Sequence, residues 1–183
     1  MLPHRPTLAH RLRLLAAMGA LSLLAACSTL DQGKSPQLDA HASWIVLPFA
    51  NHTETPLAGQ RAEAIAQALL STQGAGTNVR RAPLATQQEA LFNSGDSQRM
   101  QDALAWAREQ KLRYALAGSV EEWRYKVGVD GEPAVGLALQ VIDLQSGVVV
   151  WSGSGGQTGY SRESLAGTAQ QLVGKLLAGA GLE

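Results

Sequence analysis

The second half of the chain contains three strand-like segments separated by two short turns, and this pattern restricts the possible folds more than any other feature. The segments lie within residues 113–155, and the turns contain Asp130-Gly131 and Ser146-Gly147. Glycine readily adopts the positive φ angles that tight hairpins require. Residues 134–142, AVGLALQVI, are apolar on both sides apart from one glutamine, which indicates a strand buried in a sheet. We therefore predict an antiparallel meander that does not itself span a membrane.

The first half of the chain alternates strand and helix signals. Residues 44–49, WIVLPF, form a short apolar run that predicts a buried strand. Residues 58–70 place apolar side chains at three- and four-residue steps, so these side chains share one helical face. A shorter strand is expected within residues 74–83, and a second helix starts at Asp96 or Ser97.

These signals combine into one fold class. A third helix, which Ser161 can cap, follows the meander. The predicted order is β-α-β-α-β-β-β-α, a mixed-sheet α/β (α+β) layer fold with helices packed on the sheet and the antiparallel meander at its late end. Residues 43–183 are expected to form a single domain of this kind.

The first 27 residues have the three parts of a lipoprotein signal. Residues 1–13 contain three arginines and no acid, and residues 14–26 are almost entirely small and apolar. This run is shorter than the roughly 20 residues that a helix needs to cross a membrane. Leu24-Ala25-Ala26-Cys27 closes the run and resembles the bacterial lipobox. The resemblance implies that residues 1–26 are a signal peptide and that Cys27 carries a diacylglycerol and an N-acyl chain.

The residues after Cys27 are expected to link the lipid to the domain. Ser28 stands where inner-membrane retention typically uses Asp, which favours the inner leaflet of the outer membrane. Residues 28–42 mix Ser, Gly, Pro and charge without a period and predict a flexible tether. The domain should therefore stay close to the membrane, on its periplasmic side.

Composition argues against several other classes of function. A single cysteine cannot form an internal disulfide, and the four histidines lack the spacings that hold a metal. A chain that begins at Cys27 keeps 12 basic and 15 acidic residues, so nucleic acid is not an expected partner. Glu121 and Glu122 are neighbours in a predicted strand, so they are expected to point to opposite faces and not to share a catalytic site. We predict no enzyme activity and no cofactor beyond the covalent lipid.

The late part of the chain resembles a known family. Residues 118–155 and the stretch TGYSRESLAGTAQQL resemble the PelC family of outer-membrane lipoproteins, and the match extends over residues 113–173. The first half is looser and is similar to TolB-like amino-terminal domains. The resemblance implies a homo-oligomeric ring of twelve copies beneath a separate outer-membrane β-barrel, PelB. This ring would guide the cationic amino-sugar polysaccharide Pel toward export in biofilm formation through an electronegative funnel.

The resemblance also assigns roles to individual residues. Trp151 matches an aromatic position that faces the membrane in the family. This favours an interface over a core position for the Trp151 side chain. The candidates for the acidic lining are Glu121, Glu122, Asp130, Glu132 and Asp143. Two alternatives stay open: a monomeric periplasmic binding module that activates a cell-wall synthase, and a curli-type secretion component.

Overall fold

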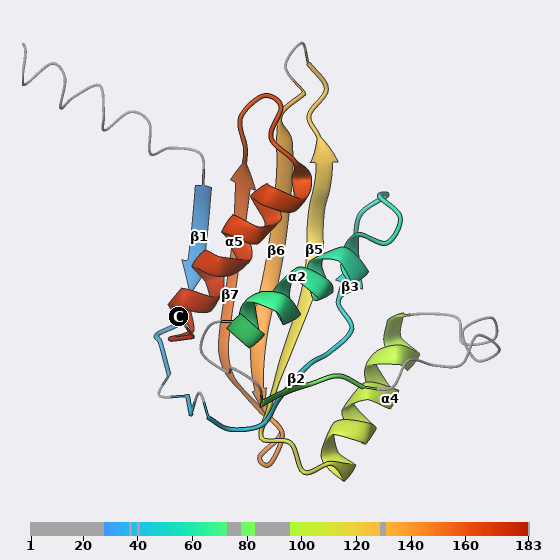
Figure 1. Ribbon diagram of the computed structural model, residues 1–183, viewed down its shortest axis with the longest axis vertical. Coiled ribbons are helices and arrows are strands. Elements are labelled where there is room, and N and C mark those ends of the chain that lie inside the picture. Colours follow the sequence, from blue (N-terminus) through green and yellow to red (C-terminus); the bar gives the residue numbers. More distant parts are fainter. Residues whose placement is uncertain are drawn as a thin grey trace, which may run out of the picture.

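The computed structural model describes residues 28–36, 38–39, 41–72, 78–82, 96–128 and 131–182. Within these residues, seven strands form one mixed sheet in the order β1-β7-β6-β5-β2-β4, and the short strand β3 pairs with β5 (Figure 1). The predicted fold class, a mixed α/β sheet with helices packed on it, is confirmed. The signal segment, Cys27 and Asp130 lie outside the described residues.

The meander is the largest part of the sheet. It consists of β5 (Tyr114–Tyr125), β6 (Pro133–Asp143) and β7 (Val148–Thr158), and each strand runs antiparallel to the next. Gly131 and Gly147, at the two connections, have φ angles of 53° and 73°. Both values lie in the left-handed region that glycine tolerates without steric cost. The predicted glycine-dependent turns are therefore confirmed.

The first half of the chain adds the parallel part of the sheet. β2 (Trp44–Val46) runs parallel to both β5 and β4 (Val79–Arg80), and β3 (Ala50–Asn51) continues alongside β5. Helix α2 (Ala58–Thr72) connects the β2-β3 segment toward β4. A parallel connection needs such a crossover because the chain must return to the end of the sheet where it started.

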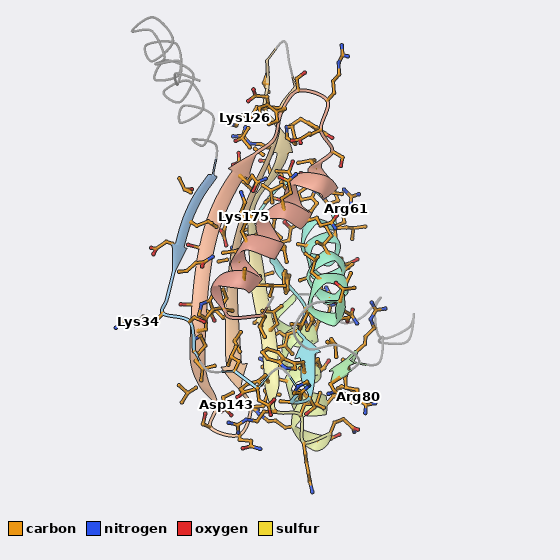
Figure 2. The ribbon with its side chains drawn as sticks, turned by 60° about the vertical axis from the view of Figure 1, so that its left-hand side comes forward. Lys34, Arg61, Arg80, Lys126, Asp143 and Lys175 are labelled. Carbon is orange, nitrogen blue, oxygen red and sulfur yellow. The ribbon has the colours of Figure 1, made fainter. Side chains whose placement is uncertain are left out.

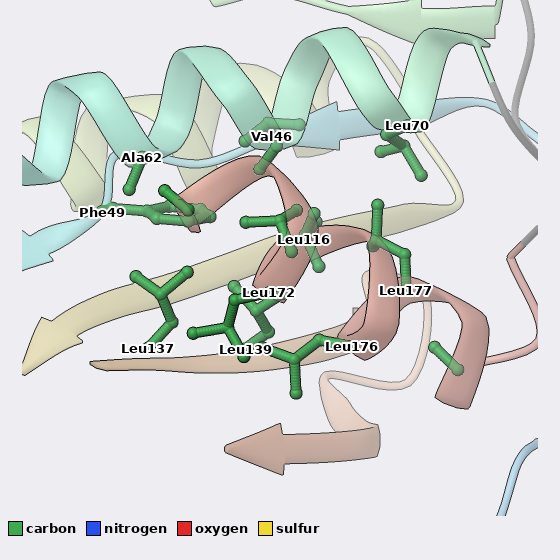
Figure 3. Packing of buried hydrophobic residues seen from close by; sticks show 14 of the residues in the cluster. Val46, Phe49, Ala62, Leu70, Leu116, Leu137, Leu139, Leu172, Leu176 and Leu177 are labelled. Atoms are coloured by element: carbon green, nitrogen blue, oxygen red, sulfur yellow. The ribbon is translucent and has the colours of Figure 1, made fainter. Parts of the chain in front are cut away.

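Two helices cover one face of the sheet, and a third covers part of the other face. On the first face, α2 packs beside α5 (Leu165–Gly179), and Figure 3 shows leucines of α5 between the helix and the strands. Leu172, Leu176 and Leu177 are completely buried there, and burial of each such side chain contributes about 1.5–3 kcal/mol. On the second face, α4 (Asp96–Glu109) packs through Ala103 and Ala107.

Helix α5 begins later than the sequence predicts. Ser164, not Ser161, is its N-cap, and the Ser164 hydroxyl accepts a hydrogen bond of 3.0 Å from the backbone N–H of Gly167. Serine is one of the preferred N-cap residues, so both positions are suitable by residue type. The choice depends on the preceding loop, in which the carboxylate of Glu163 accepts from the backbone N–H of Tyr160 at 2.8 Å.

The segment predicted as a flexible tether begins instead with a strand. β1 (Ser28–Gln32) pairs antiparallel with β7 from Ser28 opposite Gln157 to Gln32 opposite Gly153. Gly155 makes this pairing possible, since a Cβ atom on that residue would lie 2.7 Å from a methyl carbon of Leu30. The order of residues 28–32 therefore depends on the glycine-rich strand beside them, and β1 has no strong strand pattern of its own.

Candidate functional site

One end of the sheet lies next to the proposed lipid. Ser28 is opposite Gln157 and directly follows Cys27 in the sequence. The same end holds the last residues of β5 and the first residues of β6, since Tyr125 is opposite Pro133. We call this the anchor end. Lys126 marks it in Figure 2, and Asp143 lies near the other end.

The anchor end carries exposed apolar and aromatic side chains. Tyr125 and Tyr160 are 49% and 65% exposed, and Val127 is fully exposed. Tyr125 is held in place because its hydroxyl accepts from the N–H of Leu165 at 3.4 Å. Within the described residues, no helix has the length and apolar character needed to cross a membrane.

Trp151 does not lie on a surface of the folded chain. Its side chain belongs to the core beneath α5, and the residue is only 3% exposed. A Cβ atom on Gly153 would lie 2.7 Å from the Trp151 ring, so the glycine makes room for the indole. The interface position expected for Trp151 is thus incorrect for this fold, and the exposed tyrosines at the anchor end are Tyr125 and Tyr160.

Near the anchor end, one face of the sheet points away from α2 and α5. Helix α4 covers the other end of this face, where it packs with Ala115 and Ala117 of β5. We call the remaining area the open face. It carries small or polar residues: Thr29, Asp31, Ser119, Gly136, Ala138, Ser152, Ser154 and Gly156.

A β-bulge places both adjacent glutamates on the open face. Val120 is opposite Leu137 and Glu122 is opposite Gly136, so Glu121 is an extra residue in β5. A Cβ atom on Gly136 would lie 3.3 Å from the Cβ of Glu122 and 3.6 Å from that of Glu121. A bulge puts two residues opposite one and interrupts the alternation of side chains. The expectation that Glu121 and Glu122 point to opposite faces is therefore wrong.

Glu121 is held by two neighbours. The Ser119 hydroxyl donates to its Oε1 atom at 2.6 Å, and Nδ1 of His52 lies 3.0 Å from the same oxygen. The hydrogen bond from Ser119 lowers the pKa of Glu121, partial burial opposes this shift, and the hydrogen bond from His52 adds to it. Glu121 therefore remains a carboxylate over a wider acid range than an isolated glutamate.

The loop that carries His52 is fixed to the bulge. The backbone N–H of His52 donates to the carbonyl of Val120 at 2.9 Å, and the Thr55 hydroxyl donates to the carbonyl of Trp123 at 2.6 Å. These bonds satisfy backbone carbonyls on both sides of the extra residue. The positions of Glu121 and Glu122 are thus set by the fold and not by free rotation of a loop.

The remaining acidic candidates are in different surroundings. Glu122 pairs with Arg124 at 2.8 Å, and Glu132 is exposed beside the β5–β6 connection at the anchor end. Asp143 is mostly buried, and its Oδ2 atom lies 2.8 Å from Arg113. Its other oxygen accepts from the backbone N–H groups of Gln145 and Ser146 at 2.9 and 3.2 Å. Asp143 therefore stabilises a turn at the far end and does not join Glu121 and Glu122.

The open face offers negative charge beside a shallow groove. A shallow groove on it lies between Asp31 of β1 and Glu121 of β5, with Gly136, Ser154 and Gly156 between them. The Ser119 hydroxyl donates a hydrogen bond to the Glu121 carboxylate and so orients it beside this groove. Within the described part of the chain, no three His, Cys, Asp or Glu side chains are grouped as metal ligands.

Sequence patterns did not reveal three members of this surface. Asp31 lies in the segment expected to be a tether, and Ser119 and His52 come from positions far apart in the sequence. Only the parallel pairing of β3 with β5 brings His52 next to Glu121.

Comparison with solved structures identifies the family. No family model matches the chain, and no curated protein matches it. The PelC dodecamer from Paraburkholderia phytofirmans is 42% identical, with a TM-score of 0.68, and the match covers 84% of this chain and 96% of that one. This chain belongs to the PelC family. A variant PelC dodecamer from the same organism matches at 42% identity over 83% of this chain and 98% of that one, with a TM-score of 0.68.

A more distant structure shares the fold. Lipoprotein GNA1162 from Neisseria meningitidis is 21% identical, with a TM-score of 0.56, over 75% of this chain and 96% of that one. At this identity the similarity concerns the arrangement of sheet and helices.

Proposed function

We propose that this protein is an outer-membrane lipoprotein that forms a ring and guides a cationic exopolysaccharide toward a separate outer-membrane β-barrel. The observation that carries the proposal is the bulge in β5, which presents Glu121 and Glu122 together on the open face. The family supports the ring, since the PelC relatives from Paraburkholderia phytofirmans are dodecamers.

The anchor end supports attachment to a membrane. A lipid on Cys27 would lie one residue before β1, at the end where Tyr125, Val127 and Tyr160 are exposed. Aromatic side chains are enriched where protein meets the interface of a bilayer. A covalent lipid with a second apolar contact gives more stable attachment than one signal alone. The outer membrane is the proposed location, and the covalent lipid is its proposed modification.

The open face supports guidance of a polycation. Glu121 is anchored by Ser119 and His52, and its lowered pKa keeps it charged. Repetition of the same carboxylates around a ring would sum into a negative potential that raises the local concentration of a cationic polymer. Such steering weakens as ionic strength rises, because salt screens charges separated by more than about 8–10 Å.

The experiment compares export in cells that carry one of two variants of equal charge change. In Glu121→Gln with Glu122→Gln, secreted polysaccharide should fall several-fold while the protein level and ring mass stay unchanged. Asp102 and Glu109, which are both exposed on α4, provide the matched control, and Asp102→Asn with Glu109→Gln, which also removes two charges, should export normally. Normal export by the double variant would refute the role of the open face.

A second measurement tests the assembly itself. The native mass of the lipidated full chain in detergent should correspond to a ring. A monomer that is fully active would instead favour a binding module for a cell-wall synthase, and a particle that inserts as a barrel would favour a curli-type component. The same preparation should bind polylysine at low salt and lose it at high salt.

A further inference from the structure

Strand β1 forms one edge of the sheet and has few of the features that usually protect such an edge. It is the first strand in the order β1-β7-β6-β5-β2-β4 and pairs with β7 alone among the described strands. Residues 28–32, STLDQ, contain no lysine or proline, and Leu30 is 43% exposed. Edge strands with unpaired backbone groups attract further strands or chains unless charge, proline or another segment protects them.

The other side of the sheet carries positive charge. β4 is the last strand, and Arg80 and Arg81 at its end are both exposed. Arg81 is oriented by Gln67 of α2, whose side-chain oxygen accepts from two of its nitrogens at 3.0 and 2.7 Å. Figure 2 shows Arg80 and Arg61 on the side of the molecule away from β1. Asp31 is the one charged residue of β1, and it is exposed.

A ring requires two different complementary surfaces on each subunit, because its contacts are head to tail. Two edges on opposite sides of one sheet meet this requirement, whereas a single self-complementary patch would give only pairs. We infer that copies of this chain join edge to edge, with β1 of one copy against the β4 and α2 side of the next. Asp31 is level with Ser119 of β5 and Arg80 is level with Ala115, so strands inclined to the ring axis would bring Asp31 opposite Arg80 or Arg81 of the next copy. This inference rests on the proposed ring and assigns its contact surfaces.

The same contact would leave Glu121 and Glu122 accessible. Both lie on β5, which is separated from β1 by β7 and β6. It would also place all anchor ends on one side of the ring, since neighbouring copies would be related by rotation about an axis. Every Cys27 lipid would then point toward the same membrane.

Cysteine crosslinking of the full-length, lipidated chain tests this contact. Cys27 is the only cysteine in the sequence, so new thiols can be placed without competition once it is acylated. The variant with Asp31→Cys and Arg80→Cys should give a ladder of covalent oligomers after mild oxidation, and each single variant should remain mainly monomeric on a denaturing gel. Dimers from Asp31→Cys alone would indicate a β1-to-β1 contact and overturn the inference.

Charge reversal gives an independent test. Asp31→Arg should shift most of the protein from ring mass to smaller species, and Arg80→Asp with Arg81→Asp should do the same. Combining all three changes in one chain should restore the ring. The control is Glu132→Arg at the anchor end, which should leave the mass unchanged. A wild-type ring that tolerates Asp31→Arg and gives no crosslinked ladder would refute the edge contact but not the ring, whereas a monomeric wild type would refute both.

Discussion

Val120 and Trp123 lie in the same core on the helix side of the sheet, although three positions separate them along β5. In a regular strand, residues with an odd separation point to opposite faces. The two residues share a face because Glu121 is the extra residue of a bulge. The packing of Val120 and Trp123 therefore turns both intervening glutamates toward the open face.

Deleting one of the two adjacent glutamates should remove the bulge and keep the fold. The shortened strand would place Val120, one glutamate and Trp123 in regular alternation, so both core side chains stay inside. The free energy of unfolding should fall by no more than about 1–2 kcal/mol, the usual range for a single change without a core defect. Urea denaturation measures this, and export measures the loss of the second carboxylate.

A deletion elsewhere in the meander provides the contrast. Ala138 lies in a regularly paired part of β6, between the buried Leu137 and Leu139. Its removal would direct one of these leucines to the wrong face, because a one-residue shift reverses the side-chain pattern of a strand. This deletion should prevent folding. Equal effects of the two deletions would contradict the role assigned to the bulge.

Trp151→Ala should destabilise the domain strongly. The indole is buried beneath α5, and truncation of a buried Trp to Ala typically costs about 3–5 kcal/mol through lost burial and the cavity left behind. Val148→Ala changes an exposed residue of the same strand and should alter stability by less than about 0.5 kcal/mol. Thermal unfolding of both variants checks this, and an unchanged Tm for Trp151→Ala would place the indole outside the core.

The contribution of Glu121 to stability should depend on pH. Its pKa is lowered in the folded chain, chiefly by the hydrogen bond from Ser119. A carboxylate with a lowered folded pKa stabilises the fold above its unfolded pKa, and this stabilisation disappears as the pH falls through the folded pKa. The stability difference between wild type and Glu121→Gln should therefore shrink between pH 6 and pH 3, as measured by urea denaturation.

Ser119→Ala isolates the cause of this shift. Without the hydroxyl, the pKa of Glu121 should rise toward its ordinary value, which carbon NMR of the side-chain carboxyl can measure. His52→Gln should raise it less, since a glutamine amide can still donate a hydrogen bond to Glu121 and the bond from Ser119 is the largest single cause of the lowered pKa. The opposite ranking would mean that the imidazole, and not the hydroxyl, holds the charge.

Asp143 should matter for stability and not for export. Asp143→Ala removes the partner of Arg113 and the acceptor of two backbone N–H groups at the β6–β7 turn. Each of these two hydrogen bonds contributes about 0.5–1.5 kcal/mol, so we expect a loss of about 1–3 kcal/mol. Asp143→Asn keeps an acceptor oxygen and should lose less. A selective export defect in a stable Asp143→Asn variant would instead indicate a role in lining the passage.

Local patterns predicted much of the fold. The steps of apolar residues in α2 and α5 and the glycines at 131 and 147 each act through neighbours close in sequence, so a single segment contains the information. The strand within residues 74–83 was also recognised, although it is only two residues long. The site was predicted less well, since Glu121 and Glu122 were identified but their shared orientation was not.

The sequence by itself determined the meander, the helices and the PelC-family resemblance, because these depend on short-range periodicity and on residue types. It also supplied the lipobox-like motif at Cys27, whose lipidation stays a prediction. Only the tertiary structure decided the edge strand β1, the bulge at Glu121 and the burial of Trp151. Each of these depends on a partner distant in sequence: β1 needs β7, Glu121 is fixed by the loop of His52, and Trp151 is covered by packing beneath α5. Such contacts arise from the register and packing of the whole sheet, which no single segment specifies.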